Sequence, residues 1–268
     1  MKAPGWLRDL ALLLSRLTYL PLPKKWRSEP ERLPRALRFL PLLGLFSGSV
    51  LYGCMGLFAV MPRTGAAAVL VGVELLTGGA LLLRDVMRTA DGRGGGICDA
   101  ASDMLSDEPI LDNETELSVK QRRFDVGRAG LVWGLVRCVA LYFIYLFLLR
   151  HPVYGRQAVI ASAVSARLLM DWLIYQFPAF PPARLKRGLS GRGFGLACLL
   201  ALICLTPLFP GWGPSLLAGF LAALMGAYLF ASYRVRFHKA LDETCYGAVC
   251  AWADILFLLG WLTVTRLF

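Results

Sequence analysis

The length, composition and charge of the chain exclude an ordinary water-soluble domain. Of its 268 residues, 57% are hydrophobic and 18% are charged, and the mean hydropathy is +0.57. A soluble fold of this size could not cover so much apolar surface, so we expect the lipid bilayer to be its solvent. The net charge of +11 would suggest nucleic acid in a soluble protein, but its placement along the chain follows membrane topology. We therefore exclude a nucleic-acid partner.

Residues 1–38 are predicted to form an amphipathic and basic segment on the inner membrane surface. Charged residues flank the short apolar run from Leu10 to Leu14, and no small-residue cleavage site follows it. Two prolines then precede a basic run that favours anionic lipid headgroups, namely Lys24, Lys25 and Arg27.

Seven later stretches are apolar enough to cross a hydrocarbon layer of roughly 30 Å. They cover about 39–61, 65–83, 129–149, 157–176, 194–209, 214–232 and 245–265. Because lipid leaves the backbone no partner, and these runs do not alternate as barrel strands do, we predict an all-α polytopic bundle of about seven transmembrane helices. The fifth stretch is short, and we expect it to tilt or re-enter.

The charges outside these stretches predict the orientation of the chain. One face collects 23 Lys and Arg residues and the other collects 4, while every loop carboxylate lies on the basic face. The positive-inside rule then puts the N-terminus in the cytoplasm. We predict a single membrane domain over 1–268, with any site for magnesium or a general base on the cytoplasmic side or within the membrane.

Five ionisable residues fall inside predicted spans, where a charge is expected to face a partner or a water-filled cavity. Arg167 and Asp171 are four residues apart and so share one helix face. Either they form a structural ion pair, or this face lines a polar cavity in which Arg167 binds a phosphate. The others are Glu74, Arg137 and Asp254.

Residues 84–128 form a polar stretch, predicted to be a cytoplasmic acidic and glycine-rich loop that carries the candidate site. Asp99, Asp103 and Asp107 recur every four residues, so on a helix they would make one acidic stripe able to hold Mg²⁺ against a diphosphate. Gly92 and Gly94 belong to a glycine run that would let backbone approach phosphate. The alternative is a solvated, partly flexible acidic loop.

The chain resembles the cobalamin synthase family, the adenosylcobinamide-GDP ribazoletransferases, over nearly its whole length. The family's "LTRLP" and "FPLVG" stretches and the two ends of its "LTGGLHLDGLADTADG" signature have counterparts here, as have three later motifs. The matching residues are 17–21 (LTYLP), 39–44 (FLPLLG), 76–79 (LTGG), 89–92 (TADG), Ala166 and Arg167, 182–184 (PAR) with Gly188 and Leu189, and 246–248 (YGA).

The sequence also departs from the family pattern. In register, the signature's histidine becomes Leu82 and its first two aspartates become Arg84 and Arg88, which leaves Asp91; Asp85 lies one position from the first lost carboxylate. The family's "KDSRIGTFG" matches residues 122–130 loosely, and the aspartate of its "TGDxxGA" falls on Thr244.

The resemblance implies a Mg²⁺-dependent transfer in a bacterial inner membrane, facing the cytoplasm. A hydroxyl of α-ribazole, or of its 5′-phosphate, attacks the phosphorus that bears the cobinamide, and GMP leaves. Asp91, Asp99, Asp103 and Asp107 are then the predicted metal ligands, and Asp91, Arg167 and Arg184 the predicted catalytic residues. The predicted substrate-binding residues are Gly92, Gly94, Arg123, Asp125, Asp242 and Glu243.

Three other readings stay open. The replacements at positions 82, 84 and 88 suit a non-catalytic relative that binds corrinoid or scaffolds pathway enzymes, and a homo-oligomer or a complex with those enzymes fits either reading. A membrane prenyltransferase ranks third, because one acidic stripe is present where that chemistry usually needs two. A transporter ranks last, because no internal repeat is evident.

Overall fold

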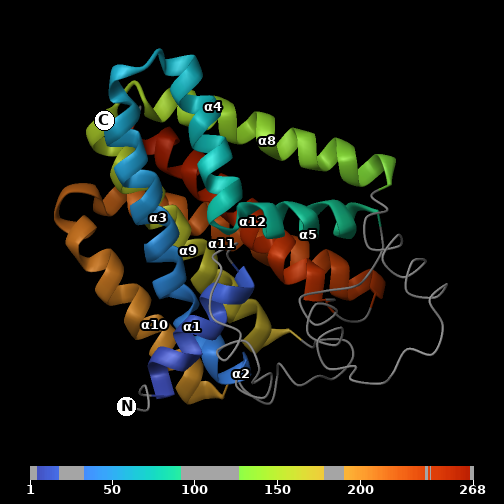
Figure 1. Cartoon of the computed structure of the whole chain (residues 1–268). Helices are drawn as coiled ribbons and strands as arrows, with labels where there is room; N and C mark the ends of the chain where they lie inside the picture. Colours follow the sequence, from blue (N-terminus) through green and yellow to red (C-terminus); the bar gives the residue numbers. More distant parts are fainter. Residues whose placement is uncertain are drawn as a thin grey trace.

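A computed structural model of the chain describes residues 5–17, 33–91, 127–177, 190–238, 241 and 243–265. The elements in these residues are all helical (Figure 1). The all-α prediction is therefore confirmed for the described part of the chain, as physics requires of backbone that must satisfy its own hydrogen bonds in lipid.

A short helical segment precedes the spans. α1 (Gly5–Leu17) buries Leu12 and Leu13 and packs beside α2 (Leu33–Ala36) and the 3₁₀ turn η3 (Leu37–Phe39). Arg38 Nη2 donates to the buried Asp9 Oδ2 at 3.4 Å, which ties α1 to the start of the first span. The predicted amphipathic helix is thus present and anchored to the bundle.

Six helices are long and apolar enough to cross a membrane, and a bent pair makes up to seven spans, as predicted. Two of the six include a final 3₁₀ turn, η4 (Phe58–Val60) and η6 (Thr206–Leu208). The main helices are α3 (Leu40–Leu57), α8 (Arg128–Leu148), α9 (Pro152–Gln176), α10 (Gly191–Leu205), α11 (Phe209–His238) and α12 (Glu243–Thr265).

The core lies around α9 and α12, which are surrounded by the other spans (Figure 1). Small residues allow their neighbours to approach closely. A Cβ added to Gly44 of α3 would come within 2.5 Å of the Ala163 carbonyl oxygen of α9. A Cβ on Gly219 of α11 would come within 2.8 Å of the Phe257 carbonyl oxygen of α12. Close backbone contact is the main source of helix association in lipid, where apolar side chains gain little by leaving the solvent.

The second span is broken in the middle. α4 (Arg63–Glu74) ends in a π-helical turn over Leu75–Gly79, and α5 (Ala80–Ala90) leaves it in a new direction. The two halves are bent by 87°, and Gly78 has φ 127°, a conformation that side chains strongly disfavour.

Two predictions are corrected by this break. The straight span at 65–83 is wrong, and residues 84–90, predicted to be loop, continue helix α5. The fifth stretch forms an unbroken helix over Gly191–Leu208, so the re-entry that we considered for it is wrong. Summed hydropathy misses the break in the second span and the continuation of α5, because a bend is set by one glycine and its packing partners and not by mean apolarity.

Candidate functional site

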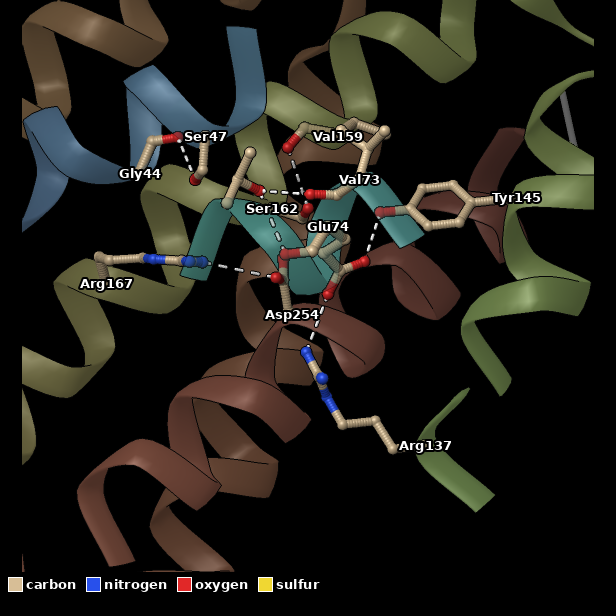
Figure 2. Close-up of polar contacts among 11 residues, drawn as sticks. Gly44, Ser47, Val73, Glu74, Arg137, Tyr145, Val159, Ser162, Arg167 and Asp254 are labelled. Carbon is tan, nitrogen blue, oxygen red and sulfur yellow. Dashed lines mark hydrogen bonds and ion pairs between the residues drawn. The ribbon is translucent and has the colours of Figure 1, made fainter. Parts of the chain in front are cut away.

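A buried ionic network lies beside the break (Figure 2). Glu74, the last residue of α4, accepts two short hydrogen bonds from α8. Arg137 Nη2 donates to Oε1 at 2.8 Å, and the Tyr145 hydroxyl donates to Oε2 at 2.6 Å. Arg137 is fully buried. A buried guanidinium needs such a carboxylate, because an uncompensated charge inside the bundle is very unfavourable.

A second ion pair joins α9 to α12. Arg167 Nη1 contacts Asp254 Oδ2 at 3.5 Å. Of the two alternatives for this face, the ion pair between Arg167 and Asp171 is therefore wrong. Asp171 is fully buried, and neither of its carboxylate oxygens has a hydrogen-bond partner in the described part of the chain. A spacing of four residues puts two side chains on one helix face, but the ionic partner of each side chain is set by the helix that packs against that face.

The two ion pairs share a small cavity inside the bundle. Ser47 donates to the Gly44 carbonyl oxygen and Ser162 to that of Val159, each at 3.1 Å, so their oxygen lone pairs are available to the cavity. The space suffices for about one water molecule and is far too small for a nucleotide. Its polar lining is Ser47, Glu74, Thr77, Tyr145, Ser162, Arg167 and Asp254.

Asp91, predicted to be both metal ligand and proton acceptor, lies just beyond the end of α5. Its Oδ2 accepts from the Gly127 amide at 2.6 Å, and its Oδ1 accepts from the Gly130 amide at 2.8 Å. These amides belong to the N-terminus of α8, where the helix dipole also favours an anion. A carboxylate has about four lone-pair sites, so Asp91 keeps acceptor capacity for another donor or a cation.

Asp85 points from α5 to the opposite neighbour, α12. It is buried, and a Cβ added to Gly247 would overlap its Oδ2. The Arg84 Nη2 lies 4.0 Å from Asp85 Oδ1. α5 therefore brings together three segments that are far apart in the sequence: the signature residues 76–91, the Gly127 to Gly130 turn, and the Tyr246-Gly247-Ala248 motif.

Most of the other predicted site residues lie outside the described residues, so the structure neither supports nor contradicts the roles predicted for them. Glu243 begins α12, and its side chain is not described. No group of three or more potential metal-ligating side chains occurs within the described ranges. Those ranges alone thus do not make up a magnesium site. The outside residues are Gly92, Gly94, Asp99, Asp103, Asp107, Arg123, Asp125, Arg184 and Asp242.

Sequence reasoning identified Glu74 and Arg137 as charges within spans but did not pair them, and it missed Tyr145. The available signal was charge balance, because an acid and a base buried in neighbouring spans are expected to neutralise each other. Tyr145 gave no signal, since a tyrosine in an apolar run is common. The amides of Gly127 and Gly130 are backbone groups, which residue types do not reveal.

Comparison with known proteins identifies the family of the chain. The family model for cobalamin-5-phosphate synthase matches residues 9–109. A Deinococcus radiodurans adenosylcobinamide-GDP ribazoletransferase is 30% identical over 96% of this chain and 89% of the relative. Relatives of the same name from Pseudomonas aeruginosa (28% identical, 89% of each chain) and Desulfitobacterium hafniense (26%, covering 95% of this chain and 96% of the relative) also match.

No solved structure shows a significant match. The likeness to the curated relatives runs through almost all of both sequences and includes the segments that meet around α5. The chain therefore belongs to the adenosylcobinamide-GDP ribazoletransferase family, as a divergent member.

Proposed function

We propose that this protein catalyses the final assembly step of cobalamin, the transfer of the adenosylcobinamide moiety from its GDP form to ribazole. The acceptor oxygen of ribazole forms a bond to the phosphorus that carries cobinamide, and the bond from that phosphorus to the oxygen of the GMP phosphate breaks. GMP leaves with the bridging oxygen, and the acceptor hydroxyl gives up its proton.

The observation that carries this proposal is the convergence on α5. Asp91 at the end of the signature is fixed by amides of α8, and Asp85 one and a half turns earlier is packed against Gly247 of α12. Segments separated by about 150 residues in the sequence thus meet at the helix that bears the family signature. The names of the relatives, which match over nearly their whole length, supply the reaction class.

Asp91 is the described residue best placed to act on the acceptor. Two amide donors hold its carboxylate at a fixed position and leave lone pairs free to accept a hydroxyl proton. Arg167 is a less direct participant, because its guanidinium contacts Asp254 and borders the small internal cavity. We assign it to bundle assembly in this structure. Magnesium dependence and a magnesium site with Asp99, Asp103 and Asp107 are proposed from the sequence alone.

We further propose that the end of α5 faces the cytoplasm of a bacterial inner membrane. The multi-pass helices make this a membrane protein, and the excess of Lys and Arg on the loops at this end supports a cytoplasmic location. Adenosylcobinamide-GDP carries a soluble nucleotide diphosphate, so a site at the membrane surface would be accessible to it from the aqueous phase.

The test is GMP release by purified protein in proteoliposomes supplied with adenosylcobinamide-GDP and α-ribazole, with Mg²⁺ or with EDTA. We expect Mg²⁺-dependent release with formation of the corrinoid product. Asp91→Asn is expected to lower kcat by about 100-fold or more, the scale for losing a general base. Gly72→Ala, in open space on α4, is the matched control and should retain wild-type turnover.

One observation favours a second candidate, a corrinoid-binding relative without turnover. Arg84 takes the place of a signature aspartate and approaches Asp85 at 4.0 Å, so the local charge differs from the family pattern. This candidate predicts saturable corrinoid binding without GMP release by a well-folded sample. Release at a rate that depends on Asp91 would exclude it.

A further inference from the structure

Helix α8 holds the broken span at two separate points. At the bend, Glu74 accepts from Arg137 at 2.8 Å and from Tyr145 at 2.6 Å, a contact we call the bend clasp (Figure 2). At the far end of α5, Asp91 accepts from the amides of Gly127 and Gly130, a contact we call the end clasp. Both half-helices are thereby bound to one continuous helix of 21 residues.

Between the clasps, α5 lies directly on glycines of α8. A Cβ on Gly130 would come within 2.6 Å of the Met87 carbonyl oxygen, and one on Gly134 would overlap the Met87 side chain. Backbone in such close contact can neither slide nor rotate without losing the contact. Close fit to α8 therefore constrains the position of α5 on one side, as contact with Gly247 of α12 does on the other.

The bend itself gives the chain little local rigidity. Gly78 lacks a side chain, and its φ of 127° lies in a region that glycine samples as readily as others. The π-helical turn around it also departs from the regular hydrogen-bond ladder. The 87° angle between α4 and α5 thus requires an external support, and α8 contacts both halves extensively.

We infer that Glu74, Arg137 and Tyr145 are positioning residues for the transfer: the bend clasp fixes α5 on α8 and so sets the place of Asp91. This inference rests on the proposed function for its catalytic consequence. Tyr145 follows Gly127 by 18 residues of α8, roughly 27 Å along the helix. Arg137 is nearer, seven residues from Gly130, but its side chain is fully buried, so the bend clasp acts through the helices and not by contact with a substrate at Asp91.

Tyr145→Phe is the sharpest variant, because it removes one hydroxyl from the bend clasp and keeps the ring. Tyr142→Phe is its matched control, since Tyr142 is a half-buried tyrosine on the same helix whose ring packs edge-on against the Phe143 ring. We expect Tyr145→Phe to lower kcat by about 10- to 100-fold, the scale of an ångström-size misplacement. The KM for adenosylcobinamide-GDP should change less than about twofold.

Hydrogen exchange supplies a readout that is independent of activity. If the clasps are linked, Tyr145→Phe should speed exchange of the Gly127 and Gly130 amides by about 10-fold or more, although the substitution is four turns beyond the nearest of them. Tyr142→Phe should leave these amides at the wild-type rate. Gly130→Ala, which displaces the Asp91 carboxylate directly, should reproduce the loss of kcat.

The results separate this inference from the proposed function. Equal kcat and equal exchange in Tyr145→Phe and Tyr142→Phe would overturn the inference, as would faster exchange at Gly127 and Gly130 with unchanged turnover. An inactive wild-type protein would refute the proposed function instead. The exchange measurement would then still decide whether the bend clasp holds Asp91 on α8.

Discussion

The inner and outer spans of the bundle differ in what they bury. In α9, 78% of the residues in an 18-residue stretch of the span are buried, whereas in α10 the figure is 11%. Five buried charges lie at interior positions of α4, α8, α9 and α12, namely Glu74, Arg137, Arg167, Asp171 and Asp254. α10, by contrast, has no Asp, Glu, Lys or Arg between Arg192 and its end.

The difference shows that these charged side chains of the spans lie at helix–helix contacts and not at the lipid-facing surface. The five charges within the spans are buried where other helices shield them from lipid, and the ion pairs Arg137–Glu74 and Arg167–Asp254 each join two helices that meet in the interior. Outer helices present leucine and tyrosine to lipid, where little is gained by packing. Substitutions in the two groups should therefore have effects of different size, and the following four predictions run from the largest to the smallest.

Glu74→Ala should have the largest effect. It removes the carboxylate that Arg137 and Tyr145 donate to, and leaves a fully buried guanidinium without that counter-charge. Breaking a buried pair in this way destabilises proteins by about 3–5 kcal/mol. Unfolding in detergent, followed by tryptophan fluorescence, would measure it. A variant as stable as wild type would show that water reaches Arg137.

Gly44→Ala should be next, because its Cβ would press on the Ala163 backbone of α9. Overpacking of this kind destabilises by about 1–3 kcal/mol. Gly53→Ala, on the same helix with nothing within 4 Å, is the control and should be neutral. Equal midpoints of thermal unfolding for the two variants would mean that α3 and α9 can separate freely.

Gly78→Ala tests the bend. A side chain at φ 127° strains the backbone by about 1–3 kcal/mol. Gly72→Ala, six residues earlier in open space, should instead be neutral or stabilising by up to about 1 kcal/mol, because alanine is the better helix former. Both can be compared by unfolding midpoint. If Gly78→Ala is the more stable of the two, the bend is absent in the membrane.

Leu199→Ala, on the lipid-facing side of α10, should have the smallest effect. Its side chain is 52% exposed, so the expected change is within about 0.5 kcal/mol, as for other exposed positions. Leu173→Ala, a fully buried residue of α9, should instead lose about 2–5 kcal/mol. A large loss at Leu199 would reveal a protein partner on that face.

These contrasts also explain what the sequence could predict. Hydropathy located the spans within a few residues, since transfer into lipid depends on composition. It missed the break, because the energy of a bend at Gly78 depends on α8. Likewise, residue type identifies the charges inside spans, but spacing offers Asp171 as one candidate partner of Arg167, whereas the partner, Asp254, lies on a helix 87 residues away. Of the candidate site, the motif residues were predictable and their convergence on α5 was not.

The Glu74 to Arg137 pair also sets an order for membrane insertion. The two residues are 63 positions apart, so at about 5–20 residues per second the ribosome needs roughly 3–13 s to make the second after the first. During that interval, Glu74 enters the translocon without its counter-charge. The broken span should thus remain near the translocon until α8 emerges, and the two segments should move into lipid together as a neutral hairpin.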